Sequence, residues 1–298
     1  MKKKIILSVL LFIPTFVFAS ENKYINTNGV EIDKSIYTEF NDVMTQKQIN
    51  ELTSFEYEKL KDKDIVSYSS EEKYFKNVYV MDSEGNVLDS YLFEMNEDDY
   101  NSDEILTPSE NFQVNSTWMG GDNTIQTDYK KLKISAARDI SNRLSVTLTN
   151  TWKKIPAVKE YDILGFRVSD SSAITYLVAT YSASQVYDGT TASYKYNTSG
   201  NTVQAKSGIA QIMNIVNSTS KSLSNNLYIT LFGNSTMASG FTLTASYQHG
   251  VNAQNTFDQV KNVTFSASGL GGVFKYPTKV ANNFDKMAGV SLLAAPKQ

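Results

Sequence analysis

Few residues of this chain could take part in chemistry, and their spacing limits what they could do. The sequence holds one histidine, His249, and no cysteine. A Ser-His-Asp triad would have to use His249, while a histidine cluster for zinc or a thiolate site cannot be assembled. His249 lies in "SYQHGVN", at the end of an expected strand and without a G-x-S-x-G nucleophile elbow. We therefore interpret it as a loop histidine.

The S-x-x-K pattern of serine-lysine acylases is matched at Ser70–Lys73 and at Ser218–Lys221. A chain rich in serine and lysine produces this pattern by chance, and no K-T-G element accompanies either copy. The first copy also lies in a region that we expect to be helical and acidic. Neither pair is assigned a catalytic role.

Carboxylates could still make a glycosidase, because that chemistry needs only two acids about 5–10 Å apart. The acids cluster in an expected linker, where mutual repulsion keeps them in solvent; they are Glu94, Glu97, Asp98, Asp99, Asp103 and Glu104. The segments "DSEGN" and "NEDDYNSDE" lack the loop pattern of calcium sites, and "SGLGGVF" lacks the lysine and helix of a phosphate loop. The sequence therefore assigns no catalytic, cofactor-binding or metal-binding residue, and it favours a non-enzyme.

The N-terminus, "MKKKIILSVLLFIPTFVFASEN", predicts export. Three lysines precede an apolar run of about 14 residues, which is short of the roughly 20 that a spanning helix needs. We expect residues 1–19 to be a signal peptide that is cleaved after Ala19, so that the protein is secreted. Without cysteine, the exported chain has neither disulfides nor a lipid-attachment site.

Charge divides the chain unevenly. Residues 21–110 hold 22 acids and 8 bases, net −14, and residues 111–298 hold 9 acids and 17 bases, net +8. The two halves should attract each other. The asymmetry fits either an acidic pro-segment that masks a basic domain or a polar N-terminal region beside a lightly charged one.

The N-terminal part of the mature chain is predicted to be an acidic helical and hairpin region over residues 20–95. Residues 20–43 show no periodicity and predict a flexible lead. Capping boxes begin helices at Thr45 with Gln48 and at Thr53 with Glu56, and a third start at Ser69 extends the helical region to about residue 76. A hairpin follows, "NVYVMDSEGNVLDSYLFEMN", in which Gly85 supplies the turn.

Residues 96–124 are rich in acids, Asn and Ser and contain a proline and a Gly-Gly pair, which predicts a linker. The remainder, residues 125–298, alternates apolar residues with Ser and Thr in runs such as 143–152, 241–247 and 263–268. "AITYLVATY" and "NLYITLF" are apolar on both faces and suit central strands. The fold class is therefore mainly β, an antiparallel β-sandwich or small barrel preceded by a small acidic helical and hairpin region.

The stretch "RLSVTLTNTWKKIPAVKEYDILGFRVSD" places Trp152, lysines and Pro156 between two strands. Proline cannot continue a central ladder, so the first strand should end at Trp152 and the second resume at Tyr161. A tryptophan at a strand end is usually a packing anchor. We interpret this stretch as a corner.

An acidic helical lead, a linker, "TWKKIPAVKEYDILGFRV" and a Ser/Thr-rich β-region together resemble a group of uncharacterised exported proteins of low-GC Gram-positive bacteria. The resemblance covers most of the mature chain. It implies export, and it supplies no activity or site residue.

These features predict an exported, non-catalytic protein that binds a cell-envelope polymer or another protein. Nucleic acid is not an expected partner, because the basic half has three arginines and no basic stripe. The alternative is a membrane-active or toxin-like factor masked by its acidic N-terminal region. It is not favoured, because the alternating runs are shorter than the roughly 9–11 residues of a spanning strand, and "SGIAQIMNIVNSTSKSL", a possible amphipathic helix, lacks a basic face.

Overall fold

The computed structural model describes residues 22–102, 124–158, 160–169, 174–188, 190–195, 202–205, 207–215, 220–233, 241–252, 262–265, 273–276 and 283–294. The expected signal peptide lies outside the described residues. Strands dominate, and every pairing between them is antiparallel. The mainly β, sandwich-like prediction is confirmed.

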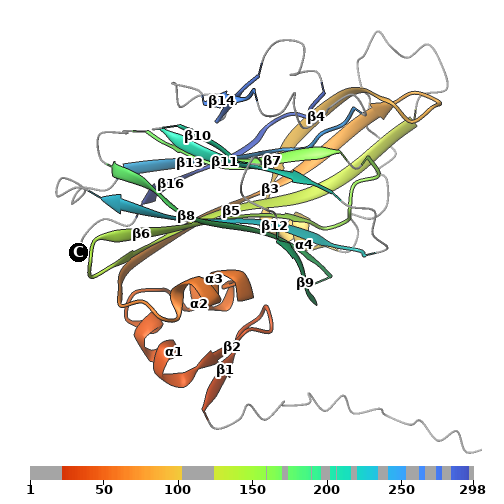
Figure 1. Cartoon of the computed structure of the whole chain (residues 1–298). Coiled ribbons are helices and arrows are strands. Elements are labelled where there is room, and N and C mark those ends of the chain that lie inside the picture. Colours follow the sequence, from red (N-terminus) through yellow and green to blue (C-terminus); the bar gives the residue numbers. More distant parts are fainter. Residues whose placement is uncertain are drawn as a thin grey trace, which may run out of the picture.

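Two sheets form the sandwich (Figure 1). The seven-stranded sheet has the order β4 (Val87–Met95), β3 (Ile65–Met81), β5 (Thr124–Asp139), β6 (Arg143–Trp152), β12 (Leu223–Gly233), β8 (Ile174–Tyr187) and β9 (Thr190–Lys195). The five-stranded sheet has the order β10 (Thr202–Ala205), β11 (Gly208–Asn214), β7 (Tyr161–Val168), β13 (Phe241–Gln248) and β16 (Ala288–Ala294).

The main core lies between the two sheets, and the alternation of each strand fills it. In β6, Leu144, Val146 and Leu148 are fully buried in this core, whereas the intervening Ser and Thr residues lie on the outer face of the seven-stranded sheet. On the other side, β7 contributes Leu164 and Phe166. The expected corner is confirmed: β6 ends at Trp152, β7 begins at Tyr161, and the connection crosses from one sheet to the other.

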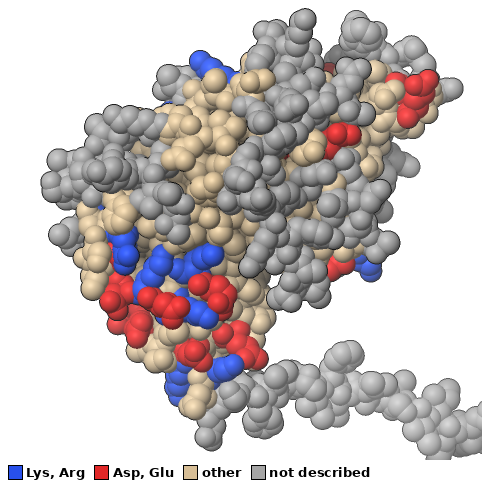
Figure 2. All heavy atoms as spheres, viewed as in Figure 1, with Lys and Arg blue, Asp and Glu red and all other residues tan. Residues whose placement is uncertain are grey.

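A cap of residues 22–64 packs on the outer face of the seven-stranded sheet (Figure 1). It contains β1 (Lys23–Ile25), β2 (Glu31–Asp33), α1 (Lys34–Asn41), α2 (Gln46–Asn50) and α3 (Ser54–Leu60). Both expected capping boxes are present. In each, the threonine side chain accepts from the backbone N–H three residues later, and the side chain of that later residue accepts from the backbone N–H of the threonine. Charged side chains of both signs gather over this cap (Figure 2).

The flexible lead expected over residues 20–43 is a wrong prediction for the part that the structure describes. Ile32 and Phe40 enter the core of the cap. The side-chain amide of Asn26 donates to the carbonyls of Ile49 at 3.0 Å and Leu52 at 2.8 Å, which ties the first hairpin to α2. These contacts are made across more than twenty residues, so local periodicity does not reveal them.

The helix expected to begin at Ser69 is also wrong, because residues 65–81 form β3. This strand pairs with β5 along almost its whole length, from Ile65 opposite Asp139 to Met81 opposite Thr124. A capping box stabilises a helix end by about 0.5–2 kcal/mol, which a long ladder of pairs outweighs. The hairpin turn itself is confirmed, with Gly85 at φ +87°. The hairpin and the β-region therefore share one sheet across the expected linker.

Two further segments differ from the sequence-based expectation. Within the expected linker, α4 (Glu97–Asn101) forms under an Asn96 cap, and Tyr100 buries its ring against Tyr74 and Tyr129; residues 103–123 lie outside the described part. The second segment is the possible amphipathic helix over residues 207–223. Its residues Gly208–Asn214 form a strand, β11, which pairs with β7. Its apolar residues are buried on both faces of a sandwiched strand.

A third layer covers the outer face of the five-stranded sheet. The short strands β14 (Thr264–Phe265) and β15 (Phe274–Lys275) pair with each other, and Val263, Val273 and Phe274 pack with Ile163 and Ile212. Of the strand expected over 263–268, the structure describes Thr264–Phe265 as strand, and residues 266–268 lie outside it.

Gly165 in β7 allows close approach of β11, and replacement by alanine should be destabilising. A Cβ atom at this position would lie 2.5 Å from the carbonyl oxygen of Ile209 and 2.6 Å from the Cβ of Ala210. Overpacking of this kind costs about 1–3 kcal/mol. Gly289→Ala in β16 is the matched control, because its nearest neighbour would lie at 3.6 Å. Urea unfolding should show a lower midpoint for Gly165→Ala only; equal midpoints would contradict the packing.

Candidate functional site

Four charged or titratable residues meet inside one end of the sandwich. We call Lys130, Asp162, His249 and Asp285 the core charge cluster. Lys130 lies on β5 and Asp162 on β7, His249 directly follows β13, and Asp285 precedes β16. All four are at most 2% exposed. Charged groups are almost never so deeply buried unless they are paired.

Lys130 and Asp285 form one of the two pairs. The Lys130 ammonium lies 2.8 Å from Oδ2 of Asp285, and both side chains are fully buried. The ammonium also lies over the rings of Trp152, at 5.1 Å, and Tyr247, at 5.3 Å. Asp285 accepts further hydrogen bonds, from the backbone N–H of His249 at 2.9 Å and from the side chains of Asn77 and Tyr79.

Asp162 and His249 form the second pair. Nδ1 of His249 lies 2.7 Å from Oδ1 of Asp162, and because a carboxylate only accepts, Nδ1 carries the proton. Asp162 also accepts from the Tyr247 hydroxyl and from the backbone N–H of Gly250. The Tyr247 hydroxyl in turn accepts from the Trp152 indole at 2.9 Å. The corner tryptophan thus anchors the cluster.

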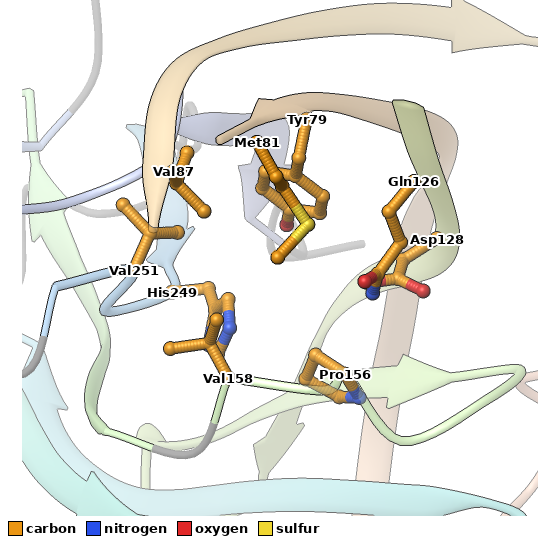
Figure 3. A pocket seen from close by; sticks show the side chains of 9 residues that line it. All are labelled: Tyr79, Met81, Val87, Gln126, Asp128, Pro156, Val158, His249 and Val251. Carbon is orange, nitrogen blue, oxygen red and sulfur yellow. The ribbon is translucent and has the colours of Figure 1, made fainter. Parts of the chain in front are cut away.

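A small hollow lies beside the His249 ring (Figure 3). It has a volume of about 10 Å³, close to the space that one water molecule requires. The ring of His249 and the carboxylate of Asp128 lie on opposite sides of it, between apolar walls that include Pro156 and Val158 (Figure 3). Oδ2 of Asp128 accepts from Gln126 at 2.9 Å, and Oδ1 has no hydrogen-bond partner among the described residues. Burial raises the pKa of Asp128.

This arrangement has the parts of an acid–base pair. Asp162 fixes the tautomer of His249, so that Nε2 can accept a proton, and the Asp128 carboxyl opposite can donate one. The same parts also serve the fold, because each charge in the core charge cluster is paired with an opposite charge, and the two carboxylates accept further hydrogen bonds. The hollow has room for about one water rather than for a substrate. The described geometry therefore serves the fold first.

The His249 pair should make stability depend on pH. Burial alone lowers the pKa of His249, but the Asp162 carboxylate more than offsets this, and the net pKa is raised. A group whose pKa is raised by folding contributes stability that is fully present below its pKa in the unfolded chain, about 6.5 for histidine. That contribution is lost as the pH rises through the pKa of the group in the folded protein. Denaturant unfolding from pH 6 upward should show this decline in the wild type, and it should be reduced in His249→Gln. Parallel pH profiles for the two proteins would contradict the pairing.

His249 directly follows β13 and lies outside the strand, as the loop interpretation expects. What that interpretation missed is that the side chain is buried and paired with Asp162. The two S-x-x-K pairs do not join the cluster. Lys73 lies on β3 and pairs with Glu94 at 2.8 Å, and Ser218 lies outside the described residues. Glu97 pairs with Lys47 at 2.9 Å on the surface, and Asp103 and Glu104 also lie outside the described part.

One group of carboxylates could hold a cation by distance alone. Oxygens of Glu51, Glu72 and Glu97 lie within 4.8 Å of one another. Two lysines compete for them: Lys47 lies 3.5 Å from Glu51 and 2.9 Å from Glu97, and Lys131 lies 3.5 Å from Glu72. These contacts make the group a network of ion pairs.

In "DSEGN", the Asp82 carboxylate accepts from the backbone N–H groups of Glu84 and Asn86, which closes the hairpin turn.

Sequence reasoning missed Lys130, Asp162 and Asp285. A signal for two of them exists, because Lys130 is in phase with the buried Leu132 and Ile134, and Asp162 is in phase with Leu164 and Phe166. A charge at an inward position of an alternating strand needs a buried partner. The sequence cannot say which partner, since Asp285 is 155 residues away from Lys130.

Comparisons with known proteins assign no family. No family model matches the chain, and no curated protein matches it. Among solved structures, one described as "pH-induced modulation of Streptococcus parasanguinis adhesion by Fap1 fimbriae" has a TM-score of 0.29 and 12% identity, and the match covers 55% of this chain and 80% of that chain. Another, "AvmM Catalyzes Macrocyclization in Alchivemycin A Biosynthesis", has a TM-score of 0.27 and 11% identity over 53% of this chain and 82% of that chain. Similarity at this level carries no argument about either fold or function.

Within the described residues, no helix is long and apolar enough to cross a membrane.

Proposed function

We propose that this chain is an exported protein that acts by binding a cell-envelope polymer or another protein, and not by catalysis. The observation that carries the proposal is the commitment of the core charge cluster to the fold. Asp285 and Asp162 each hold a cation and accept further hydrogen bonds inside the sandwich. Groups held in this way are committed to the fold, because removing one partner would leave an uncompensated buried charge. We therefore place the function on the surface of the protein.

The test is co-sedimentation of purified residues 20–298 with purified Gram-positive cell walls. Saturable binding by the folded protein is expected, and heat-denatured protein is the control. Parallel samples with walls stripped of teichoic acid, and with wall-associated proteins removed, separate a polymer from a protein target. Release of soluble wall fragments that is abolished by His249→Gln would overturn the non-catalytic proposal.

Acid–base catalysis is the second candidate, favoured by the placement of His249 opposite Asp128 across the hollow. It requires the hollow to open for a substrate. A panel of ester, amide and glycoside substrates, assayed with the wild type and with Asp128→Asn, tests it. Turnover that falls at least tenfold in Asp128→Asn supports catalysis, and turnover equal in both proteins removes it.

In the membrane-active alternative, the segment that masks the protein would be the cap alone and not the whole acidic N-terminal region. Removal of the chain up to about residue 110 would delete β3 and β4 and leave β5 with β6 as its only remaining neighbour in the seven-stranded sheet. A cut within residues 61–64, between α3 and β3, would instead release the cap alone. A protease site placed there, followed by dye release from liposomes, tests this version against uncut protein.

A further inference from the structure

A cavity lies where the cap meets the ends of β3, β5 and β6. It is lined by the end of α1 and the turn after it, by the connection from α3 to β3, and by the turn between β5 and β6. We call it the junction cavity; its lining residues are Glu39, Phe40, Asp42, Val43, Lys63, Asp64, Ile65 and Ile140. Its volume is about 220 Å³.

One wall of the junction cavity is apolar. Phe40 is buried in the core of the cap, and Val43 and Ile65 are half-buried beside it. Ile140 stands at the mouth, 69% exposed, at the tip of the β5–β6 turn. Its backbone N–H donates to the carbonyl of Asp64 at 3.0 Å, which fixes the turn against the start of β3. The apolar wall thus runs from the buried Phe40, past the half-buried Val43 and Ile65, to the exposed Ile140.

The rim of the junction cavity is acidic. The lining includes three exposed acids, Glu39, Asp42 and Asp64, and one base, Lys63. The hydrogen bonds of the Lys63 ammonium go to two hydroxyls on the outer face of the sheet, that of Ser145 at 2.5 Å and that of Tyr228. In the part of the chain that the structure describes, no ion pair joins any of the three carboxylates to a base. The cavity thus combines an aliphatic wall with a negative rim.

We propose that the junction cavity binds a lysine or arginine side chain presented by a partner protein. These side chains combine an aliphatic stem with a terminal cation, which matches the apolar wall and the acidic rim. The volume is below the roughly 300–1,000 Å³ of pockets for small molecules, so it suits one long side chain. This inference rests on the proposed function, and it names the chemistry of the partner.

The first experiment uses the full mature chain and short capped peptides. One peptide carries a single arginine between leucines, and its matched probe carries citrulline, which has the same shape without the charge. Methyl NMR should show the arginine peptide shifting the signals of Ile140 and Ile65, with citrulline binding at least tenfold more weakly. Added salt should weaken the arginine peptide further. Equal binding of the two peptides would overturn the proposal.

Substitutions then place the contact. The double variant Asp42→Asn/Asp64→Asn and the variant Ile140→Ser should each weaken the arginine peptide at least tenfold. Glu58→Gln is the control, because Glu58 is an exposed acid on α3 that does not line the cavity. Unchanged binding in Asp42→Asn/Asp64→Asn would refute the site. Since these residues are on the surface, their melting temperatures should stay close to the wild type, and the citrulline comparison needs no variant.

The same variants separate this inference from the proposed function. If the double variant binds cell walls as the wild type does, the junction cavity is not the contact site and the proposed function stands. If the wild type does not bind walls or their proteins at all, the proposed function fails, whatever the peptide result. Concentration-dependent dimerisation that the double variant loses would replace the partner protein by a second copy of this chain and would overturn the proposal as stated.

Discussion

Replacement of Lys130 by methionine is expected to lower the free energy of unfolding by about 3–5 kcal/mol. Methionine keeps the length and apolar contacts of the stem but leaves the Asp285 carboxylate without its cation, and both side chains are 0% exposed. The remaining donors to Asp285 are neutral, namely Asn77, Tyr79 and a backbone N–H. Urea unfolding followed by tryptophan fluorescence measures the change, since one of the two tryptophans, Trp152, lies beside the ammonium.

A surface pair supplies the control for Lys130→Met. Lys73 and Glu94 are as close as Lys130 and Asp285, at 2.8 Å, but they are in solvent contact, so Lys73→Met should cost only about 0–1 kcal/mol. The double variant Lys130→Met/Asp285→Asn should recover part of the loss, because the unpaired charge is then removed. Equal costs for Lys130→Met and Lys73→Met would show that the core pair does not hold the sandwich together.

Replacement of Glu56 by glutamine should loosen the cap. Glu56 is buried on α3, and its carboxylate accepts from Lys133 at 3.1 Å and from Ser135 at 2.7 Å, both on β5. Glutamine can complete the capping box with Thr53 as glutamate does. The substitution therefore removes the negative charge and leaves the helix cap in place. The Lys133 ammonium is then left unpaired at the cap–sheet contact, at a cost of about 3–5 kcal/mol.

Hydrogen exchange locates this loss. Amides of α1 to α3 should exchange faster in Glu56→Gln, while those of β6 and β12 stay close to the wild type. Glu58→Gln, two residues along the same helix and exposed, is the control. Uniformly faster exchange through both sheets would mean that the cap does not open by itself.

Protonation of Glu56 at low pH should loosen the cap, as Glu56→Gln does. Burial alone raises the pKa of Glu56, but Lys133 and the hydrogen bonds of Ser135 and Thr53 outweigh it, so the net pKa is lowered. A lowered pKa contributes stability that is present above the unfolded value, about 4.3, and is lost as pH falls through the folded value. Cap amides should therefore lose protection in that acidic range, and Glu56→Gln should lack this response.

The sequence by itself determined the features that rest on local patterns. Alternation in residues 143–152 and 241–247 predicts strands with one apolar face, and both form as predicted. The two capping boxes, at Thr45 and Thr53, also form, because each is completed by residues three positions apart. Pro156 separates two strands at the corner for the equally local reason that proline cannot donate to a ladder.

Only the tertiary structure decided what distant residues do to one another. Residues 65–81 carry a helix-start signal, yet pairing with β5 makes them a strand, since a long ladder outweighs a single cap. His249 reads as a loop residue until Asp162, 87 positions away, is placed beside it. Lys130, on β5, and Asp285, in the segment before β16, likewise meet only because the two sheets pack against each other. Burial then makes these pairings obligatory, because a charge removed from water needs a partner that folding alone can bring to it.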